Sequence, residues 1–201
     1  MIFGTIRIVF FVIIFAICVL LIWKSRLIHK RRWYLSALAV TIVLTTLSAF
    51  VPIENAFITF SSPTAAFEHI NTGNVKLIVN GEETDFVVAE KGNADSYLII
   101  PKAGNGWKMG LGTDTKRIAH KFSNGVSIEV YQYKNTGDYY ITVLNTEGGM
   151  LEISDNHNSE FSYLDKHNAS LNETFYTYYA YVKNFDAQYI LTVNGKTISI
   201  I

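Results

Sequence analysis

Two apolar stretches separated by a short basic segment constrain this chain more than any other feature. Residues 8–23 carry no charged side chain, residues 24–32 are rich in lysine and arginine, and residues 33–52 are again mainly apolar. A helix that crosses a hydrocarbon core about 30 Å thick needs about 20 apolar residues, and its backbone must be hydrogen-bonded internally. The pattern predicts a transmembrane hairpin in residues 1–53, with spans over about residues 6–23 and 33–52.

The basic segment predicts the orientation of this hairpin. Short loops rich in lysine and arginine stay in the cytoplasm, and tryptophans gather at the membrane interface. We therefore expect a multi-pass protein of the cell membrane, with its N-terminus and residues 54–201 extracytoplasmic and the lipid bilayer as its first partner. The predicted membrane-interface residues are Trp23, Lys24, Arg26, Lys30, Arg31, Arg32 and Trp33.

Three other interpretations of the N-terminal region stay open. A cleaved signal peptide would carry its positive charges before the apolar run, whereas here most of them follow it. Lipidation of Cys18 would require a small residue where Ile17 stands. Residues 30–49 would also serve as an internal signal, with cleavage near Ser48-Ala49 or Asn55-Ala56.

Charge is distributed unevenly along the chain. The formal net charge is zero, with 17 Lys/Arg and 17 Asp/Glu, but residues 1–53 hold six basic residues and no acidic one. Residues 54–201 hold eleven basic and seventeen acidic residues, a net charge of −6. A negative charge of this size favours solubility and argues against a nucleic-acid partner. The single cysteine excludes an intrachain disulfide.

The rest of the chain is predicted to be mainly β. Residues 54–73 read as a linker with one short helix, capped by Ser62, started by Pro63 and ended by Gly73. In residues 74–201, short runs of β-branched and aromatic residues alternate with turn signals such as Asn80-Gly81, Asn124-Gly125 and Asn194-Gly195. About ten strands without intervening helices predict an antiparallel β-rich domain, either a sandwich or two meanders.

Short segments of the chain resemble a known group of proteins. The run Phe60-Ser61-Ser62-Pro63-Thr64-Ala65-Ala66-Phe67, the pair Gly106-Trp107 and the closing Asn-Gly hairpin are similar to uncharacterised membrane-anchored extracytoplasmic proteins of Gram-positive bacteria. This resemblance implies a membrane-anchored protein of the bacterial cell envelope. It implies no activity and no site residues.

No residue pattern indicates catalysis or a cofactor. The five histidines are dispersed, without the spacing of a zinc site, and there is no nucleophile elbow, phosphate-binding glycine loop or EF-hand. The segment from Asp155 to Glu160 offers oxygen ligands for Ca²⁺ but lacks the central glycine of an EF-hand loop, so a solvated loop is the better interpretation. Asp165 and His167 alone make no mechanism. We predict no catalytic, cofactor-binding or metal-binding residues and no enzymatic activity.

Aromatic residues supply the one candidate binding surface. In the predicted strand 174–183, Tyr176 and Tyr178 alternate with Phe175, Tyr179 and Tyr181, so both faces of the strand are aromatic. Packing inside a sheet explains most such residues. A one-sided sheet would not bury both faces, however, and tyrosine suits the recognition of glycans, peptides or proteins. Tyr176, Tyr178, Tyr179 and Tyr181 are therefore the predicted partner or ligand surface.

Three functions follow from these features. The first is a membrane-anchored extracytoplasmic β-domain for interaction or sensing at the cell surface, with a membrane or cell-surface protein as partner. The second is an accessory subunit of a membrane protein complex, because small and hydroxylated residues in the second apolar stretch allow close helix packing. The third is an enzyme acting on the cell envelope or on glycans.

Overall fold

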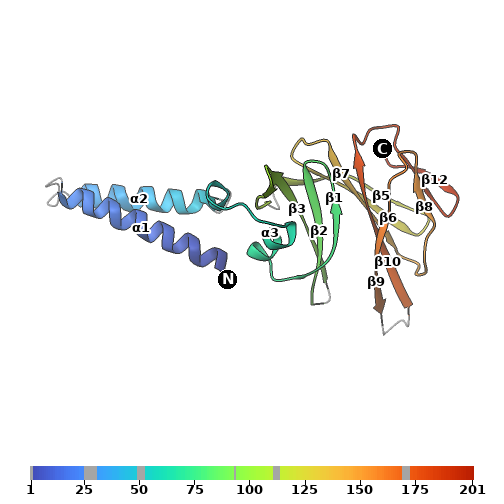
Figure 1. The fold of residues 1–201 in the computed structure, drawn as a ribbon, viewed down its shortest axis with the longest axis horizontal. Helices are drawn as coiled ribbons and strands as arrows, with labels where there is room; N and C mark the ends of the chain where they lie inside the picture. Colours follow the sequence, from blue (N-terminus) through green and yellow to red (C-terminus); the bar gives the residue numbers. More distant parts are fainter. Residues whose placement is uncertain (1, 25–30, 49–52, 93, 111–113, 169–172) are drawn as a thin grey trace. The chain divides into compact units, whose positions relative to one another are not determined.

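The computed structural model describes residues 2–24, 31–48, 53–92, 94–110, 114–168 and 173–201 (Figure 1). The chain forms two compact units. One unit comprises residues 1–58 and 69–71, and the other comprises residues 59–68 and 72–201. The first is helical and the second is mainly β.

The helical unit is built on two helices that pack side by side, α1 (Ile2–Lys24) and α2 (Arg31–Ser48), followed by a 3₁₀ turn, η1 (Ile53–Ala56). Phe11 of α1 is buried and meets Phe10 edge to face. In α2, the hydroxyls of Ser36, Thr41 and Thr46 donate to the carbonyl four residues earlier. These hydroxyls are thus satisfied within their own helix.

The predicted membrane hairpin is the main correction that the structure makes. Among the residues described, no helix combines the length and the apolar composition needed to cross a membrane. The 18 residues of α2 rise about 27 Å, and they include two arginines and several hydroxylated residues. The two predicted spans and the multi-pass localisation are therefore wrong.

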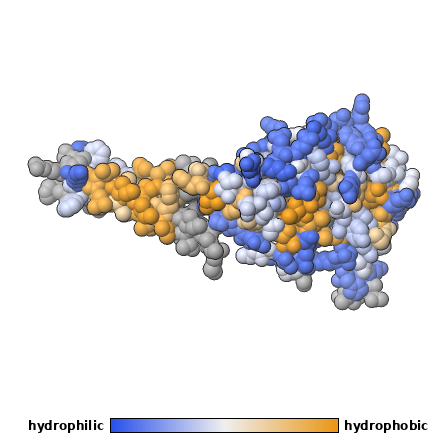
Figure 2. Space-filling view, in the orientation of Figure 1, coloured by the Kyte–Doolittle hydropathy of each residue, from blue (hydrophilic) through white to orange (hydrophobic). Residues whose placement is uncertain are grey.

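The residues assigned to the membrane interface lie at the facing ends of these helices. Trp23 and Lys24 are exposed in the last turn of α1, and Arg32 and Trp33 are exposed in the first turn of α2, which begins at Arg31. Arg26 and Lys30 lie outside the described residues. Apolar side chains dominate the visible surface of both helices (Figure 2), including Val12, Leu20, Leu21, Leu35, Ile42 and Val43, each more than half exposed.

The β unit begins with a short helix, α3 (Pro63–Ile70). The predicted cap is confirmed: the Ser62 hydroxyl accepts a hydrogen bond from the Ala65 N–H at 3.0 Å, and proline occupies the first helical position. Ala66 and Phe67 are fully buried. Just before the helix, Phe60 exchanges two backbone hydrogen bonds with Trp107, which fixes α3 to the β unit.

Three antiparallel sheets make up the rest of this unit (Figure 1). The first sheet contains β1 (Asn74–Asn80), β2 (Thr84–Lys91), β3 (Ala94–Ala103) and β4 (Gly106–Trp107), in that order. The second has the order β5-β6-β7-β10-β9, with β5 (Thr115–Ser123), β6 (Val126–Tyr133), β7 (Asp138–Asn145), β10 (Glu173–Lys183) and β9 (Ser162–Asn168). The third has the order β12-β11-β8, with β12 (Lys196–Ser199), β11 (Ile190–Val193) and β8 (Ile153–Asp155). The predicted antiparallel β-structure is confirmed.

The second sheet is the middle layer, with a hydrophobic core on each face. One core joins its residues Tyr131, Tyr140 and Tyr179 to Phe86, Val88 and Ile99 of the first sheet. The other core joins its residues Ile128, Ile141 and Val182 to Leu191, Val193 and Ile198 of the third sheet. Because adjacent residues of a strand point to opposite faces, the middle strands are apolar on both sides. The sequence predicts either a sandwich or two meanders, whereas the structure packs three sheets in three layers.

Two of the Asn-Gly pairs form the tight turns that the sequence predicts. Asn124 and Gly125 have φ angles of 51° and 72°, and Asn194 and Gly195 have φ angles of 49° and 74°. Positive φ at both central residues is typical of type I′ hairpin turns. The Asn80-Gly81 pair differs, because Gly81 has no positive φ and the connection to β2 runs through three residues, 81–83.

Candidate functional site

The four tyrosines predicted as a partner surface are divided between the two cores. Tyr178 is 4% exposed in the core against the third sheet, with Tyr176 packed beside it. Tyr179 is equally buried in the core against the first sheet, with Tyr181 packed beside it. Their alternation along β10 thus serves packing on both faces of the middle sheet. The structure does not bring the four hydroxyls together on one face.

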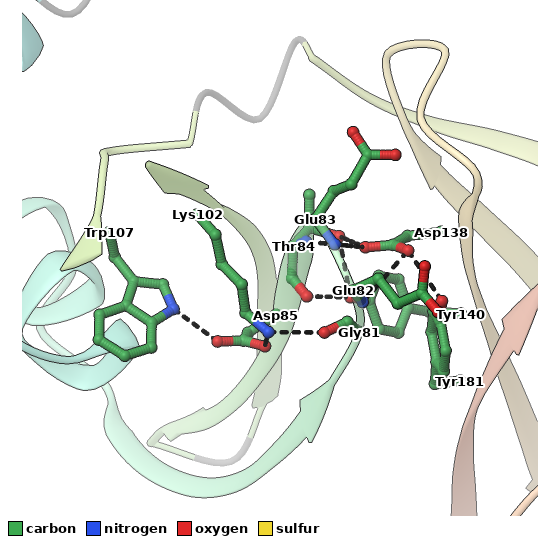
Figure 3. Close-up of polar contacts among 10 residues, drawn as sticks. All are labelled: Gly81, Glu82, Glu83, Thr84, Asp85, Lys102, Trp107, Asp138, Tyr140 and Tyr181. Atoms are coloured by element: carbon green, nitrogen blue, oxygen red, sulfur yellow. Dashed lines mark hydrogen bonds and ion pairs between the residues drawn. The ribbon is translucent and has the colours of Figure 1, made fainter. Parts of the chain in front are cut away.

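A buried carboxylate, Asp138, joins the first two sheets (Figure 3). It lies at the start of β7 and is 1% exposed. Its oxygens accept hydrogen bonds from the N–H groups of Glu82, Glu83 and Thr84, at 3.3, 2.7 and 2.7 Å. They also accept from the hydroxyls of Thr84 and Tyr181, both at 2.9 Å. Successive backbone N–H groups that converge on one anion form a nest, and here the anion is part of the protein.

Tyr140 completes this network. Its hydroxyl donates to the Thr84 carbonyl at 2.7 Å and lies 2.9 Å from the Thr84 hydroxyl. Burial raises the pKa of Tyr140 well above its usual value, so the phenol stays neutral and remains a donor. The carboxylate and the phenol together hold the β1–β2 connection against the middle sheet.

The same network explains the glycine of the Asn80-Gly81 pair. A Cβ at position 81 would lie 2.7 Å from Asp138 Oδ2 and 2.8 Å from the Thr84 carbonyl, and would touch the Tyr140 hydroxyl. We expect Gly81→Ala to destabilise the β unit by about 2 kcal/mol, because the crowded atoms are held by other contacts. Urea denaturation measures the change. Gly137→Ala is the control, since its Cβ would meet only Asn184 Oδ1 at 3.3 Å; an equal loss in both variants would contradict this explanation.

A second buried carboxylate, Asp85, is also engaged on both oxygens (Figure 3). Lys102 Nζ lies 3.0 Å from Asp85 Oδ1, and the Trp107 indole N–H donates to Oδ2 at 2.5 Å. Lys102 also donates to the Gly81 carbonyl at 2.6 Å. This partly buried ion pair and its additional hydrogen bonds tie β2, β3 and β4 to the 81–83 connection. Protein groups thus contact all four carboxylate oxygens of the two buried aspartates.

An open pocket lies where β3 of the first sheet meets β5 and β6 of the middle sheet. It encloses about 360 Å³ and is lined by Tyr97, Thr115, Arg117 and Tyr131. Each of these residues lies on a strand, so the walls are set by the sheet register. Arg117 stands opposite Tyr131 in the β5–β6 pairing, next to a bulge between Arg117 and Ala119. A pocket of this size suits a small ligand or one unit of a polymer.

Hydrogen bonds connect the polar groups of this pocket in a chain. The Tyr97 and Tyr131 hydroxyls lie 2.6 Å apart, and the Tyr131 hydroxyl donates to Glu129 Oε2. Arg117 Nη1 pairs with Glu129 Oε1 at 2.6 Å. The Tyr97 ring stacks on Phe86, with centroids 5.5 Å apart and planes inclined by 19°. The phenols, the carboxylate and the guanidinium therefore hold one another in place.

Electrostatics keep the pocket close to neutral. Burial raises the pKa of Tyr131, so its phenol stays protonated. Burial would also raise the pKa of Glu129, but hydrogen bonds from Tyr131 and Arg117 outweigh it, and the net shift is downward. The hydrogen bond to Glu129 raises the pKa of Arg117. At neutral pH one positive and one negative charge therefore face each other.

One polar group of the pocket is not satisfied by the protein. Thr115 Oγ1 is buried and has no hydrogen-bond partner among the residues that the structure describes. Buried hydroxyls normally have a partner, so a bound hydroxyl or water at the pocket wall would complete this site.

Two other pockets have weaker chemistry. One, of about 220 Å³, is lined by Lys76, Glu90, Asp95 and Lys166 among others, and these residues pair with each other on the surface, Lys76 with Glu90 and Lys166 with Asp95. Another, of about 330 Å³, lies between β1 and β9 and has Tyr181 in its wall. Its tyrosine hydroxyl is already bonded to Asp138, so fewer groups converge on a ligand there.

The polar loop after β8 binds its own carboxylate. Asp155 Oδ1 accepts from the N–H groups of His157 and Ser159, and Oδ2 accepts from the Tyr189 hydroxyl at 2.7 Å. Within the described ranges, no group of three His, Cys, Asp or Glu residues is placed to hold a metal ion. The loop is thus organised by internal hydrogen bonds.

Comparison with family models, with curated proteins and with solved structures found no match. A proposal for the function therefore rests on the geometry of the β unit.

Proposed function

We propose that the protein is a non-enzymatic recognition protein, and that its β unit binds a ligand in the pocket formed by Tyr97, Thr115, Arg117 and Tyr131. The observation that carries this proposal is the convergence of a guanidinium, two phenols and an unsatisfied hydroxyl on one open volume of about 360 Å³. Pockets with a few convergent polar groups on an aromatic wall are typical binding sites.

The rigidity of the pocket side chains favours ligand binding over catalysis. The phenols and Glu129 are bonded to one another, and Phe86 braces Tyr97 from the core. Side chains fixed in this way lose little conformational entropy when a ligand binds. The acidic group of the pocket, Glu129, is engaged by both Arg117 and Tyr131, so this carboxylate is not free to act as a general base.

A titration of the full chain with four small probes tests the proposal. Glucose, N-acetylglucosamine, acetate and triglycine are added separately, and backbone amide shifts are followed by NMR. We expect at least one probe to give saturable shifts at residues 97, 115, 117 and 131 together, and Arg117→Ala to abolish them. Absence of shifts at these residues with all four probes, or turnover of a probe by the unmodified chain, would overturn the proposal.

A second function, assembly through the helices, is favoured by a separate observation. The exposed side chains of α1 and α2 are largely apolar (Figure 2), and apolar surface of this extent marks an interaction site. We expect the full chain to elute well above its 22.7 kDa in size-exclusion chromatography with light scattering. A fragment of residues 59–201, which contains both β cores, is expected to be monomeric. Monomers in both cases would contradict assembly through the helices.

A further inference from the structure

Side chains on one face of the middle sheet extend the pocket into a strip. The register places Arg117 opposite Tyr131, His120 opposite Glu129, and Phe122 opposite Ser127. Because alternate residues of β6 share a face, Tyr131, Glu129 and Ser127 form a row, and this row is about 13 Å long at about 3.3 Å per residue. We call these three opposed pairs the β5–β6 strip.

The β5–β6 strip is buried at the pocket and becomes exposed to solvent towards its far end. Tyr131 is buried, Glu129 and Ser127 are half-buried, and Phe122 at the far end is 64% exposed. His120 is exposed and lies 3.3 Å from the Ser127 hydroxyl through Nε2. An aromatic ring therefore stands at each end, Tyr97 in the pocket and Phe122 at the open end, with polar groups between them.

Charge balance narrows the class of ligand. The Arg117 guanidinium is paired with Glu129 at 2.6 Å, so an anionic ligand would have to displace that carboxylate. A cationic ligand would meet Arg117 itself. Neutral ligands keep the ion pair intact and still reach the guanidinium N–H groups that Glu129 does not use, since a guanidinium has five donors.

Hydrogen-bonding chemistry narrows the class of ligand further. The strip presents donors from Arg117, acceptors from Glu129, and hydroxyls from Tyr97, Thr115 and Ser127, which both donate and accept. Sugar hydroxyls have the same dual character, and the C–H face of a sugar ring packs against an aromatic ring. A peptide strand would instead need the free backbone edge of β5, which the bulge between Arg117 and Ala119 interrupts.

We propose that the β5–β6 strip binds a neutral oligosaccharide, with one sugar ring in the Tyr97–Arg117–Tyr131 pocket and the following rings along β6 towards Phe122. This assignment rests on the proposed binding function and names its ligand class. The length of the strip matches a short oligosaccharide better than a single sugar. Phe122 then contributes to the affinity only for ligands that are longer than a single sugar.

The test uses calorimetric and NMR titrations of the full chain with four probes: cellopentaose, chitotetraose, a heparin-derived hexasaccharide and pentaglycine. The chitotetraose is the N-acetylated form, which is uncharged. At least one of the two neutral oligosaccharides is expected to bind with shifts along residues 117–131. Arg117→Ala should weaken this binding about tenfold, through loss of charged hydrogen bonds. Phe122→Ala should weaken binding of the oligosaccharide several-fold and leave binding of its monosaccharide unchanged.

Tyr163→Ala is the matched control. Tyr163 is an exposed aromatic residue of the same sheet, 48% exposed, but its register partner Tyr178 faces the other core. We expect no change in affinity for this variant. Binding of the sulfated probe or of pentaglycine at the pocket, without binding of either neutral oligosaccharide, would overturn the saccharide assignment and leave the binding function standing. If none of these four probes binds, and the four small probes cause no shifts either, both the saccharide assignment and the proposed binding function are overturned.

Discussion

Replacing Asp138 with alanine is expected to destabilise the β unit by about 4 kcal/mol. The change removes a buried acceptor of five hydrogen bonds and leaves three backbone N–H groups and two hydroxyls to be satisfied elsewhere. Each buried donor without a partner costs about 1–3 kcal/mol, and relaxation of the 81–83 connection recovers part of the sum. Urea denaturation followed by circular dichroism gives the change in unfolding free energy.

Two further variants separate the hydrogen bonds from the loss of a side chain. Asp138→Asn keeps the volume but turns an N–H₂ group towards N–H donors, so we expect a loss between that of the alanine variant and zero. Asp165→Ala removes an exposed aspartate of β9 and should change stability by less than about 0.5 kcal/mol. A loss below about 1 kcal/mol for Asp138→Ala would show that the nest is not a major source of stability.

Local signals predicted local structure well. The Ser62-Pro63 start of α3 and the turns at Asn124-Gly125 and Asn194-Gly195 depend on single residues and their immediate neighbours, so they can be read from a sequence. The antiparallel β-structure follows from the same kind of signal. Gly81 shows the limit of this approach: the pair Asn80-Gly81 has the composition of a type I′ turn, but its glycine is required by packing against Asp138 and Tyr140 from β7.

The arrangement of the sheets could not be read from the sequence. The aromatic residues on both faces of β10 predict one exposed face in a sandwich, because a sandwich buries only one face of each sheet. The third sheet removes that requirement, and Tyr178 and Tyr179 each enter a core. It is built from the β11–β12 hairpin and from the short strand β8, which lies before β9 and β10 in the sequence.

The helical region was misjudged for a related reason. An apolar composition predicts that a segment avoids water, but it does not identify what covers the segment. Among the described residues, neither α1 nor α2 combines the length and the apolar composition of a membrane span, although the composition of residues 8–23 and 33–52 favours one. The apolar residues exposed on these helices therefore direct attention to assembly.

The pocket was missed because its residues are separated in sequence and joined by register. With the turn at Asn124-Gly125 in place, pairing across β5 and β6 brings His120 next to Glu129. Continuing that register without a bulge would place Ile118, not Arg117, opposite Tyr131. The bulge between Arg117 and Ala119 shifts the arginine into the pocket. Tyr97 then arrives from a different sheet, which no local pattern indicates.

Alkaline pH is expected to unfold the β unit cooperatively between about pH 10 and 12. Tyrosine in an unfolded chain has a pKa of about 10, whereas burial raises the pKa of Tyr179 to about 12. Burial also raises the pKa of Tyr131, Tyr133, Tyr140, Tyr181 and Tyr189. Above about pH 10 the unfolded chain therefore binds fewer protons than the native chain, so stability falls as pH rises.

The raised pKa of Tyr179 alone indicates how large this loss of stability is. Two pKa units correspond to about 3 kcal/mol, and a domain is stabilised by only about 5–15 kcal/mol, so a few such tyrosines suffice for unfolding. Phenolate absorbance and circular dichroism, recorded on the same samples across this pH range, should change together. Tyr179→Phe removes one ionising group and should raise the midpoint pH, while Tyr163→Phe, at an exposed site, should not. Gradual ionisation of all tyrosines near pH 10 with an unchanged dichroism spectrum would contradict burial of these hydroxyls as the cause.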